Sequence, residues 1–550
     1  MSDVAVQQRP GAGTRPERFQ SSRFEEPAAG SKPNLSGALL FFLLLVGGLG
    51  YAIYGLVTDM SASHAPALAI GTLVLLGLAL LVALGFEFVN GFHDTANAVA
   101  TVIYTNSLSP AVAVVWSGTF NFLGVLTSTG AVAYSIITML PIDLILNAGS
   151  TGGYPMIFAL LIAAILWNLA TWAFGIPNSS SHALIGSIIG VGLANQMLAP
   201  ASEASAGLQW SPVISVLKSL LFSPIIGFIA AGGLLLLLKL MVHRKDLYQA
   251  PQGKKPPPLW IRGLLILTCT GVSFSHGGND GQKGMGLIML ILIGAAPTAF
   301  ALNRAMPDSA MPAFIQTTHQ AEAILHSHAG SVASPDAAQA RSVVDHALKT
   351  RALNEPTVYA ALAALSGDIA SQIQKNGTIR HVPAEAVPNI RNDMYLASAA
   401  VGSLIKTPGA FSGADAGTMK AYTGHLNQGT RYIPIWVKVS VAIALGLGTM
   451  VGWKRIVITV GEKIGKDHLT YAQGASAELV AAATIGAAEA YGLPVSTTHI
   501  LSSGVAGTMA ANGSGLQWST LRNMAMAWIL TLPVAALLAG VLYTVLHSVF

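Results

Sequence analysis

The sequence predicts an all-α polytopic membrane protein built from two related halves. Of its 550 residues, 52% are hydrophobic and only 10% are charged, whereas an average soluble protein is about 25% charged. The mean hydropathy is +0.58. Two similar polar strings, Phe88 to Ala98 and Phe274 to Gly284, each place an aspartate within a long apolar segment. The chain is long enough for roughly 10–12 transmembrane segments of about 20 residues each.

We expect four parts along the chain. Residues 1–36 are polar and are predicted to form a disordered tail. Residues 37–302 form a first membrane region with repeat 1 and the start of repeat 2, residues 303–431 an extramembrane insert, and residues 432–550 a second membrane region that completes repeat 2. Apolar segments lie near 37–57, 66–89, 110–139, 155–176, 212–241, 263–274, 285–302, 433–452, 470–491 and 521–549.

Three largely uncharged stretches rich in Gly, Ser and Asn are predicted to be re-entrant hairpins or half-helices. They span residues 90–109, 177–196 and 494–515. These stretches are too polar to face lipid and too apolar for an exposed loop. Irregular backbone is tolerated at membrane depth only where it is buried in protein or lines a cavity.

The insert at 303–431 is the one large polar segment. Its Ala-rich stretches, Ala338 to Leu353 and Tyr359 to Gln374, predict amphipathic helices. A loop that joins the two halves explains such a segment, and a regulatory domain is the alternative. The lone Cys269 excludes a disulfide framework within one chain.

Two basic loops bear on the orientation. Lys239 to Arg262 and residues 453–468 are rich in Lys and Arg, which favours the cytoplasmic side. One net crossing on each side of the insert would place the insert outside. A hairpin at Gly277–Gly284 flanked by two crossings would place it inside, so the charges leave both alternatives open.

The two aspartate strings predict cation ligands within the membrane. An ionised carboxylate in hydrocarbon is costly, so an intramembrane aspartate marks an ion or substrate path. Amide side chains and carbonyls near glycines would add oxygen ligands, the type that hard cations prefer. The candidate cation or coupling residues are Asp94, Asn97, Asp280, Asn279, His93, Glu478 and Gln282, with Asp94 and Asp280 as ligands of any co-transported metal.

A second duplicated motif predicts an anion site. Gly175 to His182 and Gly492 to His499 both contain Gly, Pro, three positions rich in hydroxyls, and His. Proline is favoured in the first turn of a helix, and a helix N-terminus with nearby hydroxyls binds phosphate or sulfate. The candidate phosphate ligands are Ser179, Ser180, Ser181, Ser496, Thr497, Thr498, Gln282 and Lys283.

The order and spacing of the motifs indicate a duplication. Asp94 precedes Ser179 by 85 residues and Asp280 precedes Ser496 by 216, and the difference of 131 is close to the length of the insert. An anion and a cation bound side by side would neutralise each other in a site of low dielectric constant. Further site-lining candidates are Asn168, His182, His499 and Glu87, whereas Glu489 is assigned a structural role.

These residues resemble the inorganic phosphate transporter family called Pit or PiT, and most closely its bacterial low-affinity branch. Gly91 to Ala98 and Gly277 to Gly284 occupy the duplicated Gly-x-Asn-Asp-type signature of that family, and Pro177 to His182 and Pro494 to His499 its paired hairpins. The resemblance implies an inverted-repeat transporter with two re-entrant hairpins and broken helices. It also implies uptake of a divalent metal–phosphate complex with protons, or with sodium in other branches.

Two departures from the family pattern bear on coupling. His93 replaces an Asn before Asp94, and Gln282-Lys283 replaces an Ala-Asn pair in the second copy. One hypothesis is that the Lys283 ammonium acts as a tethered cation that disfavours sodium and favours protons. The alternative is that Lys283 pairs with phosphate or with Asp280.

The sequence therefore predicts a secondary active transporter that imports inorganic phosphate, with no enzyme activity and no cofactor. We expect a multi-pass protein of the cytoplasmic (inner) membrane whose partners are phosphate, a coupling cation and the lipid bilayer, without nucleic acid. A homodimer is compatible with such a fold. The competing interpretations are a sodium-coupled phosphate symporter, a transporter of another oxyanion such as sulfate, a phosphate sensor, and a membrane metal phosphohydrolase.

Overall fold

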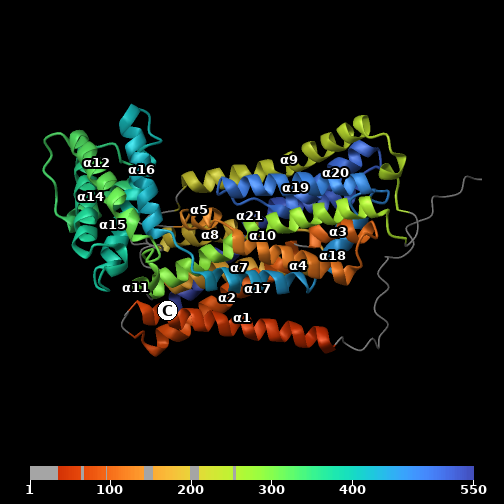
Figure 1. Ribbon diagram of the computed structural model, residues 1–550, viewed down its shortest axis with the longest axis horizontal. Helices are drawn as coiled ribbons and strands as arrows, with labels where there is room; N and C mark the ends of the chain where they lie inside the picture. Colours follow the sequence, from red (N-terminus) through yellow and green to blue (C-terminus); the bar gives the residue numbers. More distant parts are fainter. Residues whose placement is uncertain are drawn as a thin grey trace, which may run out of the picture. The chain divides into compact units, whose positions relative to one another are not determined.

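The computed structural model describes residues 35–63, 67–94, 96–140, 153–198, 208, 210–251 and 255–549. These residues are predominantly helical, and an isolated antiparallel bridge joins Gly465 to Leu516. The expected all-α class is thereby confirmed for the described part of the chain (Figure 1). By clustering of its contacts the chain divides into residues 1–43 and residues 44–550, and the packing described below lies within the second unit.

The helices before the insert form the first group. They are α1 (Leu35–Ala62), α2 (Ile70–Asp94), α3 (Ala96–Tyr104), α4 (Pro110–Thr127), α5 (Ala131–Ile137), α7 (Gly153–Ala173), α8 (Ser180–Leu198), α9 (Trp210–Met241), the short 3₁₀ helix η1 (Lys245–Tyr248), α10 (Leu259–Ala295) and α11 (Pro297–Phe300).

The remaining helices belong to the insert and to the second membrane region. In the insert they are η2 (Asp308–Ala310), α12 (Met311–Ala329), α13 (Ala337–Thr350), α14 (Pro356–Asn376), η3 (Ile379–His381), α15 (Val387–Leu404) and α16 (Gly413–Thr430). After it come α17 (Ile435–Thr449), α18 (Lys454–Glu462), α19 (Tyr471–Ala490), α20 (Thr497–Asn512) and α21 (Trp518–Val549).

Seven helical spans among the described residues are long and apolar enough to cross a membrane, or eight if a pair bent by 76° at residues 430–435 is one span. The seven begin at Leu35, Ile70, Pro110, Gly153, Ser180, Pro212 and Trp518. Helix α10 is 37 residues long, and it carries the polar string from His276 to Lys283 in its middle. The spans found by length and apolarity are thus fewer than the roughly 10–12 expected, and α10 is not among them.

The helix α10 runs without a break from Leu259 to Ala295. The alternative of a hairpin at Gly277–Gly284 is therefore wrong, and the glycines there do not free backbone carbonyls for ligands. Gly277 instead allows a close helix crossing, because a Cβ atom at this position would lie 2.1 Å from the Asn121 carbonyl oxygen of α4. Close crossings through small residues are typical of membrane helices.

Corresponding helices of the two halves pack reciprocally. Helix α8 packs against α21 and α20 against α9, while α4 packs against α10 and α17 against α2. Each motif-bearing helix therefore contacts a helix from the other half. The polar motifs of the two halves are held near one another by this exchange of partners.

The insert folds into its own group of helices. Helices α12, α14, α15 and α16 lie side by side in Figure 1, and α12 contacts α14 while α15 contacts α16. The two amphipathic helices expected at Ala338 to Leu353 and Tyr359 to Gln374 are confirmed as α13 and α14. Their apolar faces are buried, including Val344 of α13.

An ion pair between the partly exposed Arg341 and the buried Asp393 joins α13 to α15 in the insert. Arg341 Nε and Nη2 donate to Asp393 Oδ1 at 2.5 Å and Oδ2 at 2.9 Å, and the Asp393 side chain is fully buried. Burial raises the pKa of the Asp393 carboxyl from 3.8 to about 6, and the charge of Arg341 opposes this only in part.

This pKa predicts how stability depends on pH. Between pH values of about 4 and about 6 the folded insert binds a proton that the unfolded chain does not, so the contribution of Asp393 to the free energy of unfolding falls as pH rises, by about 1.4 kcal/mol per pKa unit. Above that window the contribution is constant. Thermal denaturation should therefore show the wild type losing stability relative to Asp393→Asn from pH 4 to pH 6. A relative gain over the same range would contradict this.

Candidate functional site

The two Pro-hydroxyl-His hairpins have the same local backbone structure. Gly175 and Gly492 both have φ of +66°, a left-handed conformation that glycine adopts at little cost. In both copies the next residue donates its N–H to the carbonyl five positions earlier, and a short extended stretch then leads into α8 or α20. The duplication inferred from the sequence is thus repeated in the conformation of the chain.

The first hydroxyl of each hairpin caps the helix that follows. Ser179 Oγ accepts a hydrogen bond from the His182 N–H at 3.2 Å, and Ser496 Oγ accepts one from the His499 N–H at 3.1 Å. Serine is favoured at this position because it satisfies one of the helix's free N–H groups. These two serines thus have a structural role that is independent of any ligand.

The second hydroxyl of each hairpin is buried and has no hydrogen-bond partner within the described structure. Ser180 Oγ and Thr497 Oγ1 are the atoms concerned, and they occupy the same position of the duplicated motif at the first residue of α8 and of α20. An unpaired buried hydroxyl is costly. A bound anion that accepts hydrogen bonds from both hydroxyls would remove that cost.

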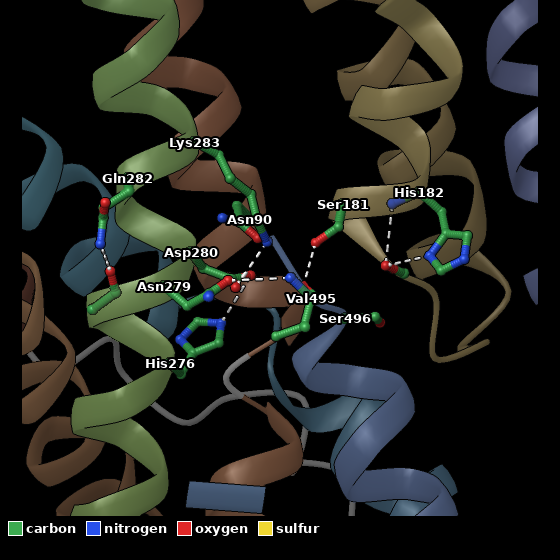
Figure 2. A network of polar contacts seen from close by, with 12 residues as sticks. Asn90, Ser181, His182, His276, Asn279, Asp280, Gln282, Lys283, Val495 and Ser496 are labelled. Atoms are coloured by element: carbon green, nitrogen blue, oxygen red, sulfur yellow. Dashed lines mark hydrogen bonds and ion pairs between the residues drawn. The ribbon is translucent and has the colours of Figure 1, made fainter. Parts of the chain in front are cut away.

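The third hydroxyl of the first hairpin links the two hairpins. Ser181 Oγ donates to the Val495 carbonyl oxygen at 2.7 Å, as Figure 2 shows. The rings of His182 and His499 lie 4.5 Å apart, and the equivalent third hydroxyl of the second hairpin, on Thr498, is fully buried. The N-termini of α8 and α20 therefore meet, and their partial positive charges favour an anion there.

The two histidines are held by neighbouring groups. His182 Nδ1 lies 2.9 Å from Ser179 Oγ, and the His499 ring stacks on Trp528 with centroids 4.1 Å apart. Both histidines are buried.

A buried ion pair lies on α10 beside the hairpins. Lys283 Nζ is 2.7 Å from Asp280 Oδ1, and both side chains are fully buried. The second carboxylate oxygen, Oδ2, is 3.5 Å from His276 Nε2. Figure 2 shows Asn90 of α2 next to this pair. Of the partners expected for Lys283, the structure therefore has it paired with Asp280.

The residue before Asp280 fastens α10 to the second hairpin. Asn279 Nδ2 donates to the Leu493 carbonyl oxygen at 3.1 Å, and its Oδ1 accepts from the Val495 N–H at 3.5 Å. Because Ser181 binds the same Val495 from the other side, α10 and both hairpins form one connected network (Figure 2). The structure brings the second aspartate motif and both hydroxyl motifs together.

The structure does not bring Gln282 to the hydroxyl groups. Its amide donates to the Gly278 carbonyl oxygen at 2.7 Å and to Glu489 Oε1 at 3.1 Å, and its Oε1 accepts from the Val132 N–H at 2.9 Å. Gln282 thus fastens α10 to α5 and α19. Figure 2 shows its side chain on the far side of α10 from Lys283.

The first aspartate motif is described only in part. The side chains of Asp94 and Asn97 lie outside the described residues. His93 Nε2 lies 3.3 Å from Thr171 Oγ1 near the end of α7, the helix that leads into the first hairpin. Asn279 is the equivalent residue of the second copy, and it contacts the second hairpin.

The remaining candidates, Glu87, Glu478 and Asn168, make other contacts. Glu87 Oε2 accepts from Asn90 at 3.3 Å, and the Glu87 side chain packs against Gly284 of α10. Glu478 Oε2 accepts from Thr268 at 2.6 Å on a different stretch of α10. Asn168 Oδ1 accepts from Asn178 at 3.4 Å at the base of the first hairpin.

Sequence reasoning missed two polar residues of the network, Asn90 and His276. Both lie four positions before the motif aspartate, one in each copy. His276 Nδ1 contacts Asn121 Oδ1 at 2.8 Å in addition to its contact with Asp280. Comparing the two copies position by position would have identified them, because both copies have a polar residue at this offset.

The helix N-termini at the two hairpins complement an anion, whereas Lys283 is already paired with Asp280. Within the residues that the structure describes, no group of three or more His, Cys, Asp or Glu side chains is arranged to hold a metal ion. The converging helix N-termini and the hydroxyls of Ser180 and Thr497, which have no hydrogen-bond partner among the described residues, complement negative charge.

The chain is similar in sequence to several known proteins. Residues 90–539 match the model of the phosphate transporter family. The chain is 43% identical over 491 residues to the low-affinity inorganic phosphate transporter PitA of Escherichia coli K12, covering 85% of this chain and 96% of the relative. It is 42% identical to PitB of the same strain, covering 86% and 98%. A solved sodium-dependent phosphate transporter is similar at 20% identity with a TM-score of 0.48, covering 87% and 100%.

Proposed function

The chain belongs to the phosphate transporter family, and we propose that it imports inorganic phosphate across the cytoplasmic membrane as a secondary active transporter. We further propose that the transported species is a divalent metal–phosphate complex and that protons are co-transported. Sodium coupling and transport of another oxyanion are the competing proposals, and they predict different ion requirements.

The observation that carries the proposal is the pair of equivalent buried hydroxyls that have no hydrogen-bond partner among the described residues. Ser180 Oγ and Thr497 Oγ1 stand at two helix N-termini that meet. Phosphate has several acceptor oxygens, so it can accept from both hydroxyls and from helix N–H groups at once. The two halves of the repeat would then each contribute half of the phosphate site.

Helix directions support an inverted repeat. Helices α4 and α10 run in the same direction, since Ser117 contacts Ser273 at 2.7 Å and Ser128 contacts Met285 at 4.0 Å further along both helices. Residues 105–109 join α3 to α4, and these two helices contact each other, so α4 reverses the direction of the span Ile70–Tyr104. The span Ile70–Tyr104, which carries the first aspartate motif, and α10, which carries the second, are thus antiparallel. An inverted repeat around a central site has this arrangement.

Uptake of radiolabelled phosphate into proteoliposomes tests the proposal. We expect uptake driven by an imposed pH gradient and increased by Mg²⁺, with no requirement for sodium. Uptake driven only by a sodium gradient would overturn the proton coupling and leave phosphate transport intact.

Competition and binding measurements distinguish phosphate transport from sulfate transport, phosphate sensing and ester hydrolysis. If sulfate competes with the uptake of radiolabelled phosphate as effectively as unlabelled phosphate does, the proposal that phosphate is the specific substrate is contradicted. Phosphate binding without uptake under any gradient would contradict transport and point to a sensor, and release of phosphate from esters would point to a hydrolase.

A further inference from the structure

We propose that the Lys283 ammonium occupies the place of a coupling cation at Asp280, so that the second half of the site operates without sodium. The inference rests on the proposed phosphate transport and specifies its ion requirement. It concerns one half of the site only, since the equivalent position of the first half is Asn97.

The geometry shows that the carboxylate of Asp280 is already neutralised. Lys283 Nζ lies 2.7 Å from its Oδ1, with both side chains fully buried, and the two residues are three positions apart on one face of α10. His276 Nε2 lies 3.5 Å from the other oxygen. The Lys283 ammonium alone therefore balances the charge of Asp280, which does not need a mobile cation.

The pair is placed where a coupling cation would act. Asn279, next to Asp280, is hydrogen-bonded to Leu493 and Val495 of the second hairpin. Ser181 of the first hairpin binds the same Val495. A charge held at Asp280 therefore lies one residue from the network that joins both hairpins.

Comparison of the two halves shows what the lysine changes. The aligned strings read Asp94-Thr95-Ala96-Asn97 and Asp280-Gly281-Gln282-Lys283. Carboxylate and amide oxygens are ligands for a hard cation, whereas an ammonium only donates hydrogen bonds and carries the positive charge itself. The first string thus contains an oxygen ligand pair for a cation, and the second contains the cation.

Removal of the ammonium should create a need for a mobile cation. A buried carboxylate that loses its partner is strongly destabilising unless another positive charge replaces the lost one. In Lys283→Asn the side chain would match Asn97, so Asp280 and the new amide would offer oxygen ligands to sodium. We therefore expect the variant to acquire a sodium dependence that the wild type lacks.

The test uses full-length protein purified in the presence and absence of sodium. We expect phosphate uptake by Lys283→Asn in sodium-free medium to fall at least about tenfold, because Asp280 is then uncompensated, and to recover when sodium is added. Binding of ²²Na⁺ to the detergent-solubilised variant, with a sodium-induced rise in its melting temperature, provides a readout that does not depend on transport. The wild type should keep its uptake in sodium-free medium and should bind less sodium than the variant, because its Asp280 is already paired.

Matched variants separate the charge effect from general damage. Lys283→Gln, with a longer side chain, repeats the test if Lys283→Asn does not fold. The double variant Asp280→Asn/Lys283→Asn removes both charges and should fold without gaining sodium binding. Lys349→Asn breaks a Lys–Asp pair in the insert, where Nζ lies 3.0 Å from Asp345, and should leave the sodium response unchanged.

Several outcomes would overturn the proposal. These are a folded Lys283→Asn variant that binds no more sodium than the wild type and shows no greater sodium response, and failure of both single variants to fold even with sodium. A loss of phosphate affinity in Lys283→Asn that is equal with and without sodium would make Lys283 a phosphate ligand instead. If neither the wild type nor Lys283→Asn transports phosphate but Lys283→Asn gains sodium binding, the proposed function fails and the proposed role of Lys283 stands.

Discussion

The double variant Ser180→Ala/Thr497→Ala is expected to abolish phosphate uptake while the protein still folds. Neither hydroxyl has a hydrogen-bond partner among the described residues, so its removal breaks no hydrogen bond among them. A hydrogen bond to a charged group contributes about 1.5–3 kcal/mol, and losing two should weaken phosphate binding by on the order of a hundredfold or more. Uptake into proteoliposomes and thermal denaturation measure the two properties separately.

The neighbouring serines provide the control. Ser179→Ala and Ser496→Ala remove helix caps, which costs about 1 kcal/mol each, so these variants should lower the melting temperature. The double variant of Ser180 and Thr497 should not. Uptake that survives in the double variant, or a melting temperature that falls as far as in the cap variants, would contradict the assignment of these hydroxyls to phosphate.

The duplicated motifs allow much of the site to be predicted from the sequence. The hairpins at Pro177 to His182 and Pro494 to His499 contain the same residue types at the same offsets, and the structure shows them in contact. Repeats reveal which residues belong to equivalent positions without any knowledge of the fold. They do not reveal which of three hydroxyls caps a helix and which remains free, because that depends on where each helix begins.

The sequence does not show which side chains near Asp280 point to the same face of α10, because it does not show that this segment is a continuous helix. Several glycines near Asp280 disfavour a helix by intrinsic propensity, so the sequence alone places both Gln282 and Lys283 at the phosphate site. Once the helix is continuous, Lys283 lies three residues from Asp280 on the same face and pairs with it. Gln282 points to another face and contacts Glu489.

Contacts between segments far apart in sequence were also beyond prediction. The amphipathic pattern of α13 and α14 predicts that these helices exist, because a 3.6-residue period is a local property. The pair of Arg341 with Asp393 joins residues 52 positions apart. Its existence follows from how the helices of the insert pack, which the period of a single helix does not specify.

Gly277→Ala is expected to prevent correct packing of α10 against α4 and with it phosphate uptake. The added Cβ would lie 2.1 Å from the Asn121 carbonyl oxygen, and backbone atoms cannot move aside as a flexible side chain can. Overpacking a helix crossing costs about 1–3 kcal/mol or more. Separation of the helices would also displace Asp280, three residues further along α10. A lower melting temperature and lost uptake are the expected measurements.

Gly271→Ala on the same helix tests whether the close approach is the cause. There the nearest atom to an added Cβ is Ala482 Cβ at 3.5 Å, an ordinary van der Waals distance. Alanine favours a helix over glycine by about 1 kcal/mol, so this variant should be at least as stable as the wild type and should transport phosphate. If both variants lose stability equally, helix flexibility and not the crossing with α4 explains the glycines. If both retain uptake, α10 does not depend on close contact with α4 to hold Asp280 in place.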